Sequence, residues 1–120
     1  MNTLIRTGLL ACALLGGSAM AAQLTCKVTA KQSFGGYSSN CFGMSMVLNN
    51  KPTTVNFRIE NLAAPVKQVL WSNAPTCSAT ATTCAFPLYP YSPYELTATI
   101  LYQNGTYEET SATAMYETGF

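Results

Sequence analysis

The stretch Tyr94–Glu117, YELTATILYQNGTYEETSATAMYE, carries the pattern of a β-hairpin and decides the fold class. Apolar and polar residues alternate in both halves of the stretch, which is the period of half-buried strands. The two halves are separated by the turn-forming residues Gln103, Asn104 and Gly105. No helical period competes with this alternation, so we predict two antiparallel strands.

The turn of this hairpin determines which residues face each other across the two strands. A two-residue Asn-Gly turn would set Ile100 opposite Glu109 and would mix the apolar face of one strand with the polar face of the other. A three-residue loop over residues 103–105, with its glycine in the left-handed conformation of a G1 bulge, sets Leu96 opposite Ala112. Because this register keeps the apolar side chains together, we predict the three-residue loop.

Alternation upstream of the hairpin predicts further strands. The segment Pro65–Ser72 is apolar on both faces, as in a strand buried in the middle of a sandwich. Six or seven short strands without helices predict an all-β fold, a small antiparallel β-sandwich, in one domain over residues 22–120. The residues that we expect to face inward are Leu24, Cys26, Val28 and Ala30 in a strand over Gln23–Lys31, then Phe42, Met44, Met46 and Leu48, and then Val55, Phe57 and Ile59 after a turn at Asn49–Pro52, with Asn56, Arg58 and Glu60 facing outward.

The hairpin residues also resemble a known class of domain. The segment YELTATILYQNGTYEETSATAMYE is similar to the closing hairpin of bacterial extracellular immunoglobulin-like domains, the PKD-like and fibronectin-like modules, in which strands rich in Tyr, Thr and Ala flank a glycine turn. The resemblance is one of architecture, because Trp71 lies far from Cys26 and the Cys-Trp-Cys framework of true immunoglobulin domains is absent. It implies an immunoglobulin-like β-sandwich that binds, spaces or assembles.

The first 21 residues have the order of a secretory signal peptide. Arg6 precedes the apolar run Gly8–Gly17, and the small-residue pattern Ala19-Met20-Ala21 predicts cleavage after Ala21. The apolar run is shorter than the roughly 20 residues that span a bilayer, so we do not expect the leader to be retained as a membrane helix. No later segment is long and apolar enough, so we expect no transmembrane helix in the mature chain. A lipoprotein cut at Cys12 is the alternative. The leader is of the bacterial type and predicts a secreted or periplasmic protein, with association with the cell surface as a further option.

The cysteines predict two disulfides. Removal of Cys12 with the leader leaves Cys26, Cys41, Cys77 and Cys84, an even set that allows three pairings in an oxidising compartment. We favour Cys26 with Cys41 and Cys77 with Cys84, because each pair brackets a short loop rich in small residues. A zinc site of thiolates alone is disfavoured by the absence of His and of any CxxC pair, so we expect no metal and no cofactor.

Several chemistries have no side chains to perform them. The chain has no His, and its five acidic residues are all glutamates, so a Ser-His-Asp triad, a Cys-His pair and an aspartic dyad are excluded. Glu108 and Glu109 are adjacent on a strand and point to opposite faces, which prevents them from acting as a pair. Loss of Arg6 leaves five basic residues against five acidic ones, so charge-driven binding of nucleic acid is not expected. We predict a protein that is not an enzyme.

Three tyrosines are candidate binding residues. Tyr89 and Tyr91 stand among prolines at every third position in the segment 86–94, which favours a stiff, polyproline-like conformation. Exposed on such a segment, or on the Gly-rich loop around Tyr37, aromatic side chains would anchor a partner at low entropic cost. The other interpretation is a crossover between the sheets whose tyrosines cap the core. The predicted function is a binding or assembly module for a protein or a surface polymer.

Two further segments suggest other roles. The loop Ser78, Ala79, Thr80, Ala81 and Thr82 is closed by its flanking cysteines, and it is either a stapled turn or a loop that enters the cleft of a protease or lysozyme. An inhibitor of a hydrolase is therefore the alternative function. The last residues, 116–120, are either the plain end of a strand or an interface for self-assembly by strand addition.

Overall fold

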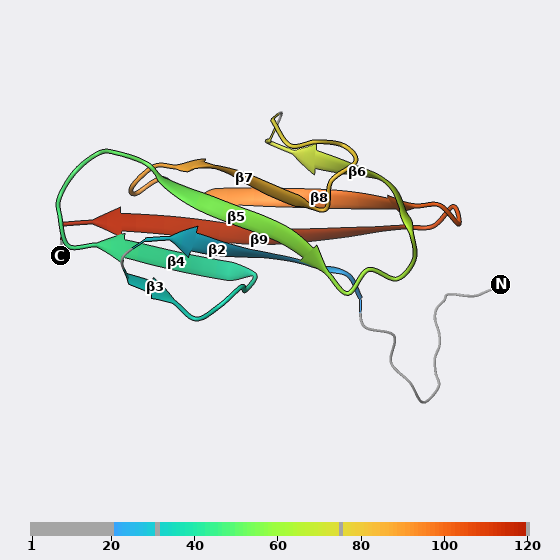
Figure 1. Cartoon of the computed structure of the whole chain (residues 1–120), viewed down its shortest axis with the longest axis horizontal. Coiled ribbons are helices and arrows are strands. Elements are labelled where there is room, and N and C mark those ends of the chain that lie inside the picture. Colours follow the sequence, from blue (N-terminus) through green and yellow to red (C-terminus); the bar gives the residue numbers. More distant parts are fainter. Residues whose placement is uncertain (1–20, 31, 75, 120) are drawn as a thin grey trace.

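The computed structural model describes residues 21–30, 32–74 and 76–119, and it forms eight strands and no helix within them (Figure 1). The predicted leader, apart from Ala21, lies outside the described residues, as do Cys12 and Phe120. The strands are β2 (Gln23–Thr29), β3 (Gln32–Phe34), β4 (Asn40–Ser45), β5 (Thr53–Glu60), β6 (Val66–Ser72), β7 (Thr83–Leu88), β8 (Tyr94–Tyr102) and β9 (Tyr107–Thr118).

The strands form two sheets that pack face to face as a β-sandwich. One sheet has the order β2-β5-β7 and the other has the order β3-β4-β9-β8-β6. The predicted all-β sandwich is confirmed. One pair departs from the antiparallel pattern, since β4 runs parallel to β9 and Cys41 lies opposite Ala114. The chain leaves β4 for the other sheet rather than turning back, so β4 is free to lie beside the last strand in the same direction.

The β8–β9 hairpin has the predicted register. Leu96 lies opposite Ala112. The Tyr102 N–H donates to the Thr106 carbonyl oxygen at 2.9 Å, which closes a loop of residues 103–105. Gly105 has a φ of 89°, a left-handed conformation that glycine adopts without steric cost. The three-residue loop is confirmed, and it places the apolar sides of both strands in the core.

The core fills the space between the two sheets. The Phe57 and Phe86 rings stack with centroids 5.5 Å apart, and the Phe86 ring lies 4.7 Å from that of Tyr94. Full burial stabilises the fold by about 1.5 to 3 kcal/mol for each large apolar side chain. The largest buried side chains are Phe57, Leu24, Leu88, Leu96, Ile100, Val28, Val55 and Val69.

Both predicted disulfides are present. Cys26 on β2 is bonded to Cys41 on β4, with their Cα atoms 5.7 Å apart, so this bond joins the two sheets. Cys77 is bonded to Cys84 on β7, with their Cα atoms 5.5 Å apart. Paired cysteines of this kind are typical of extracellular proteins.

The face assigned to β4 was wrong. Cys41 and Gly43 face the core, whereas Phe42 and Met44 lie on the other side, and the strand ends at Ser45. The expected inward residues Met46 and Leu48 stand exposed in the loop that follows. The disulfide explains the reversal, because Cys41 must point inward toward Cys26. Side chains alternate between the two faces of a strand, so Phe42 and Met44 then point away from the core.

The expected central position of β6 was also wrong, because β6 is the edge strand of the five-stranded sheet. Val69 is buried, but Leu70 on the opposite face is 48% exposed. The Val69 N–H donates to the Ala79 carbonyl oxygen at 2.8 Å, so the Cys77–Cys84 loop covers part of this edge. An apolar strand is tolerated there because the loop occupies its open hydrogen-bonding side.

Candidate functional site

The outer face of the β2-β5-β7 sheet carries the polar side chains that strand alternation excludes from the core. The register aligns Arg58 of β5 with Thr25 of β2 and Thr83 of β7. The next row aligns Asn56 with Lys27 and with Ala85. These two rows form the floor of a site on a rigid scaffold.

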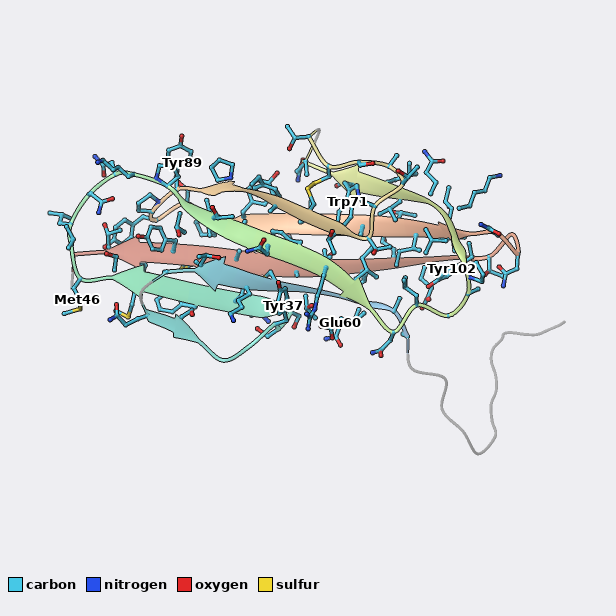
Figure 2. The ribbon with its side chains drawn as sticks, in the orientation of Figure 1. Tyr37, Met46, Glu60, Trp71, Tyr89 and Tyr102 are labelled. Atoms are coloured by element: carbon cyan, nitrogen blue, oxygen red, sulfur yellow. A yellow bond between two sulfur atoms is a disulfide. The ribbon has the colours of Figure 1, made fainter. Side chains whose placement is uncertain are left out.

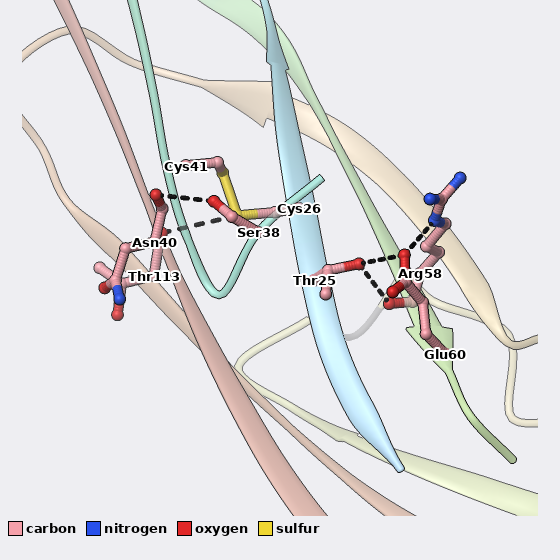
Figure 3. The surroundings of a disulfide bond; sticks show 8 residues. All are labelled: Thr25, Cys26, Ser38, Asn40, Cys41, Arg58, Glu60 and Thr113. Atoms are coloured by element: carbon pink, nitrogen blue, oxygen red, sulfur yellow. Dashed lines mark hydrogen bonds and ion pairs between the residues drawn. A yellow bond between two sulfur atoms is a disulfide. The ribbon is translucent and has the colours of Figure 1, made fainter. Parts of the chain in front are cut away.

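Tyr37 reaches this face from the loop between β3 and β4. The loop is held against β2 by a reciprocal pair of backbone hydrogen bonds between Cys26 and Ser38, at 2.8 and 3.0 Å. The Cys26–Cys41 disulfide, shown in Figure 3, holds it as well. The guanidinium carbon of Arg58 lies 3.6 Å from the centroid of the Tyr37 ring. This cation–π contact fixes the ring and the cation against each other.

A carboxylate orients the same guanidinium from the side. Arg58 Nε donates to Glu60 Oε2 at 2.8 Å, and the Thr25 hydroxyl donates to that oxygen at 3.2 Å (Figure 3). Within the part of the chain that the structure describes, the two terminal amino groups of Arg58 have no hydrogen-bond partner. They therefore remain available to an acceptor from outside the domain.

A cavity of about 430 Å³ opens beside this pair, between Tyr37 and strands β5 and β7. Asn56 lies in its wall and donates from Nδ2 to Thr29 Oγ1 at 3.2 Å, which leaves its side-chain oxygen as an acceptor. The cavity thus combines guanidinium donors, an amide acceptor, a hydroxyl and an aromatic ring. Its lining residues are Tyr37, Asn56, Phe57, Arg58, Thr83, Cys84 and Ala85.

Tyr91 lies elsewhere and has internal contacts. Its N–H donates to the Tyr116 carbonyl oxygen at 2.8 Å, and its hydroxyl both donates to the Thr118 carbonyl oxygen and accepts from the Thr118 N–H. Its φ of 59° is costly for a bulky residue and is maintained by these contacts. Tyr91 therefore fastens the turn after β7 to the end of β9, and its phenol is already engaged.

Tyr89 belongs to a different surface from Tyr37. Its side chain is 56% exposed, and it lies toward the same end of the sandwich as Met46, with Tyr37 further along the molecule (Figure 2). Contacts at the end of β9 connect the two loops, because Thr118 Oγ1 donates to the Asn49 carbonyl oxygen at 2.9 Å and Thr118 also contacts Tyr91. We call the exposed apolar residues of these two loops the apolar end; they are Met46, Val47, Leu48 and Tyr89.

The segment 86–94 contains a strand as well as a turn. Strand β7 includes Pro87 opposite Thr54 and ends at the buried Leu88, so the polyproline-like conformation was wrong for this part. Proline is tolerated there because β7 is an edge strand, where the missing N–H would face away from β5.

The candidate inhibitory loop is tied to its own scaffold by backbone carbonyls. Trp71 Nε1 donates to the Ser78 carbonyl oxygen at 2.9 Å, and the Ile59 N–H donates to that of Thr82 at 2.9 Å. The Ala79 carbonyl oxygen accepts the bond from β6 described above. An inhibitor that binds as an extended strand would need such groups to face the enzyme.

The last strand is not an edge. Strand β9 lies between β4 and β8, and beyond the start of β8 the Tyr91 N–H donates to the Tyr116 carbonyl oxygen. Near its start, the Leu24 N–H donates to Thr110 Oγ1 at 2.9 Å. Strand addition at residues 116–118 therefore has no open side to use, and Phe120 lies outside the described residues.

Within residues 21–30, 32–74 and 76–119, no three His, Cys, Asp or Glu side chains gather as a metal site would require. In the same residues no helix has the length and apolar character needed to cross a bilayer.

The fold and these sites define a small, disulfide-bonded β-sandwich domain. Comparisons with protein-family models, with curated proteins and with solved structures give no match for this chain.

Sequence reasoning named Tyr37 but missed its partners. Alternation placed Asn56 and Arg58 outward on β5, yet nothing local connected them with a loop residue about twenty positions earlier. The disulfide prediction was the available signal, since pairing Cys26 with Cys41 brings the loop that carries Tyr37 against β2.

Proposed function

We propose that this protein is an exported, non-catalytic binding module of immunoglobulin-like type, at the bacterial cell surface or in the periplasm. It acts by surface recognition through loops that present aromatic side chains on a disulfide-bonded scaffold. The observation that carries the proposal is the cavity beside Tyr37. There the Arg58 guanidinium lies against the Tyr37 ring and donates from Nε to Glu60, while its terminal amino groups stay available.

The chemistry of the cavity favours a carboxylate-bearing sugar of a surface polymer. The free edge of a guanidinium matches the two oxygens of a carboxylate. Asn56 and Thr83 offer hydrogen bonds suited to sugar hydroxyls. Ala85 is the main outward-facing apolar side chain of the wall, which leaves little for a hydrophobic ligand to contact. A volume of about 430 Å³ lies within the range of small-ligand sites.

Titration of the oxidised, processed protein with glucuronate tests this proposal. We expect amide shifts in residues 37, 56, 58, 83 and 85, and binding at least about tenfold weaker in Arg58→Gln, since a charge-assisted hydrogen bond contributes about 1.5 to 3 kcal/mol. Glucose, which lacks the carboxylate, and acetate, which lacks the sugar hydroxyls, should both bind more weakly than glucuronate. Lys67→Gln removes an exposed cation on β6 and serves as the matched control. Equal glucuronate binding by Arg58→Gln would refute the assignment.

A second recognition surface is supported by the apolar end. Three consecutive apolar residues stand exposed there, with Leu48 at 76%, and Tyr89 is 56% exposed in the turn after β7, which Tyr91 fastens to the end of β9. Residues 22–120 carry a net charge near zero, so two copies of the chain repel each other little. We therefore propose a second copy of the chain as the partner that covers the apolar end. Sedimentation should show a concentration-dependent dimer that Leu48→Ser/Tyr89→Ser abolishes and Leu70→Ser, on β6, retains. A monomer at all concentrations would exclude this assembly.

An inhibitor of a hydrolase remains an alternative proposal. The inward-facing carbonyls of the Cys77–Cys84 loop argue against it, because they are bonded within the domain. Replacing Ala79 and Thr80 with bulky residues would abolish inhibition of a protease or lysozyme if this loop were the inhibitory segment. We expect no inhibition by the unaltered protein.

A further inference from the structure

Glu108 occupies an unusual position for a carboxylate. On β9 it lies opposite the fully buried Ile100 and shares the inward face of the strand with Ala112. Glu109, the next residue, points to the solvent side, where the Thr99 hydroxyl is 3.5 Å from its carboxylate. A charged group on the core-facing side is destabilising unless donors or a cation satisfy it.

Two donors reach Glu108, and neither is a cation. The Tyr102 hydroxyl donates to Oε2, and the Ala22 backbone N–H donates to Oε1 at 3.0 Å. The Tyr102 oxygen accepts in turn from the Ala63 N–H at 3.3 Å. Burial, and then the bond to Glu108, raises the pKa of Tyr102 above its usual 10.0, which keeps this phenol a donor at neutral pH. Among the described residues, the Lys and Arg side chains form an ion pair only at Arg58–Glu60.

The backbone donor to Glu108 belongs to Ala22, the residue that directly follows the expected cleavage site. Ala22 is 7% exposed, whereas Ala21, which ends the small-residue pattern of the leader, is exposed. Hydrolysis of the Ala21–Ala22 peptide bond by water leaves a carboxylate on Ala21 and a free amine on Ala22. That amine is protonated at neutral pH.

We propose that the folded domain binds its own processed N-terminus, with the α-ammonium group of Ala22 paired with the Glu108 carboxylate. The nitrogen already lies at hydrogen-bonding distance before cleavage, so processing changes its charge without moving it. Cleavage one residue earlier or later would shift the ammonium group away from Glu108. The domain therefore reaches its full stability only after cleavage at this bond. This inference rests on the predicted leader and is independent of the proposed binding function.

Secretion of the whole chain with its leader tests the proposal. The intact mass of the purified protein should correspond to a chain that starts at Ala22. A Gly inserted between Ala21 and Ala22 keeps the cleavage pattern but moves the ammonium group by one residue. We expect this insertion and Glu108→Gln each to lower the melting temperature by about 4 °C or more. Combined, they should lower it no further than either change alone, because both remove the same ion pair.

Glu109→Gln is the matched control and should leave the melting temperature nearly unchanged. A second measurement does not depend on recovery of the insertion variant. Acylation of the Ala22 amine by a succinimidyl ester, followed by peptide mapping, should be at least about tenfold slower in the unaltered protein than in Glu108→Gln, because an ion-paired, buried amine is a poor nucleophile. A chain that starts elsewhere, additive effects, or equal acylation rates would each overturn the proposal.

Discussion

The two disulfides of this domain obey the same sequence rule and yet perform different tasks. The bond between Cys26 and Cys41 is buried, with side chains 0% and 4% exposed, and it connects the two sheets. The bond between Cys77 and Cys84 is partly exposed and closes a small loop at the edge formed by β6. Cysteine spacing thus predicts which residues pair, whereas the sheets that the bond connects determine how much of the fold depends on it.

Removal of each disulfide should give the largest effects and should separate the two regions. The loop-entropy contribution is about 3 kcal/mol for a separation of 15 residues and somewhat less for a separation of 7. Cys26→Ala/Cys41→Ala also leaves a void between the sheets, so we expect a loss of about 3 to 5 kcal/mol in the free energy of unfolding. Cys77→Ala/Cys84→Ala should cost about 2 kcal/mol. Urea unfolding of both variants measures the difference, and equal losses would contradict the comparison.

The same contrast shows what the sequence could and could not predict. The β8–β9 hairpin was predicted with its loop and register, because alternation and the turn residues agree there and both are local. The face of β4 was mispredicted because Phe42, Met44 and Met46 form an apolar alternation, whereas the disulfide at Cys41 fixes the opposite face inward. The disulfide therefore overrides the local alternation, and the side to which it turns β4 depends on the position of Cys26 on β2.

Contacts between distant segments explain the other misses. Strand β6 is apolar on both faces although it is an edge strand, and the Cys77–Cys84 loop covers part of its open hydrogen-bonding side. Its sequence is that of a central strand, and only the folded chain shows the loop. The meeting of Tyr37 with Arg58 and that of Ala22 with Glu108 likewise depend on how the sheets are connected. Candidate side chains were therefore partly predictable, while their partners were not.

Gly43 offers a test of the buried region that leaves its disulfide intact. A Cβ atom at this position would lie 2.6 Å from Val28 Cγ1, which is closer than side chains pack. We expect Gly43→Ala to lower the free energy of unfolding by about 1 to 3 kcal/mol. Val28→Ala in the same chain should make the glycine substitution less costly, because it removes the clashing methyl group.

Gly36 provides the control for this prediction, because an added Cβ atom there meets nothing within 4 Å and its φ is not left-handed. Gly36→Ala should leave stability within about 0.5 kcal/mol of the unaltered protein. Denaturant melts of Gly43→Ala, Gly36→Ala, Val28→Ala and the double variant Val28→Ala/Gly43→Ala measure these differences. If Gly43→Ala and Gly36→Ala proved alike, the close approach of β4 to β2 would be wrong.

Trp71 offers the corresponding test of the exposed region. Its indole N–H is bonded to the Ser78 carbonyl oxygen at 2.9 Å. Trp71→Phe removes this donor while keeping an aromatic ring, so we expect a loss of about 0.5 to 1.5 kcal/mol. The loop should also exchange its amide hydrogens faster, whereas exchange around Cys41 should not change. Faster exchange in both regions would show that the two are coupled.

The ion pair between Arg58 and Glu60 should have the smallest effect on stability. Both side chains are substantially exposed, at 46% and 34%, and pairs of this kind contribute about 0.2 to 1 kcal/mol before screening by salt. We expect Glu60→Gln to change the free energy of unfolding by less than about 0.5 kcal/mol, and by nothing measurable at 1 M salt. Its effect on glucuronate affinity should be larger, because Glu60 orients the guanidinium that meets the ligand. Thr54→Val, on the same strand but outside the cavity, is the control for both measurements. A Glu60→Gln protein that lost stability without any change in affinity would place this pair with the scaffold and exclude it from the recognition site.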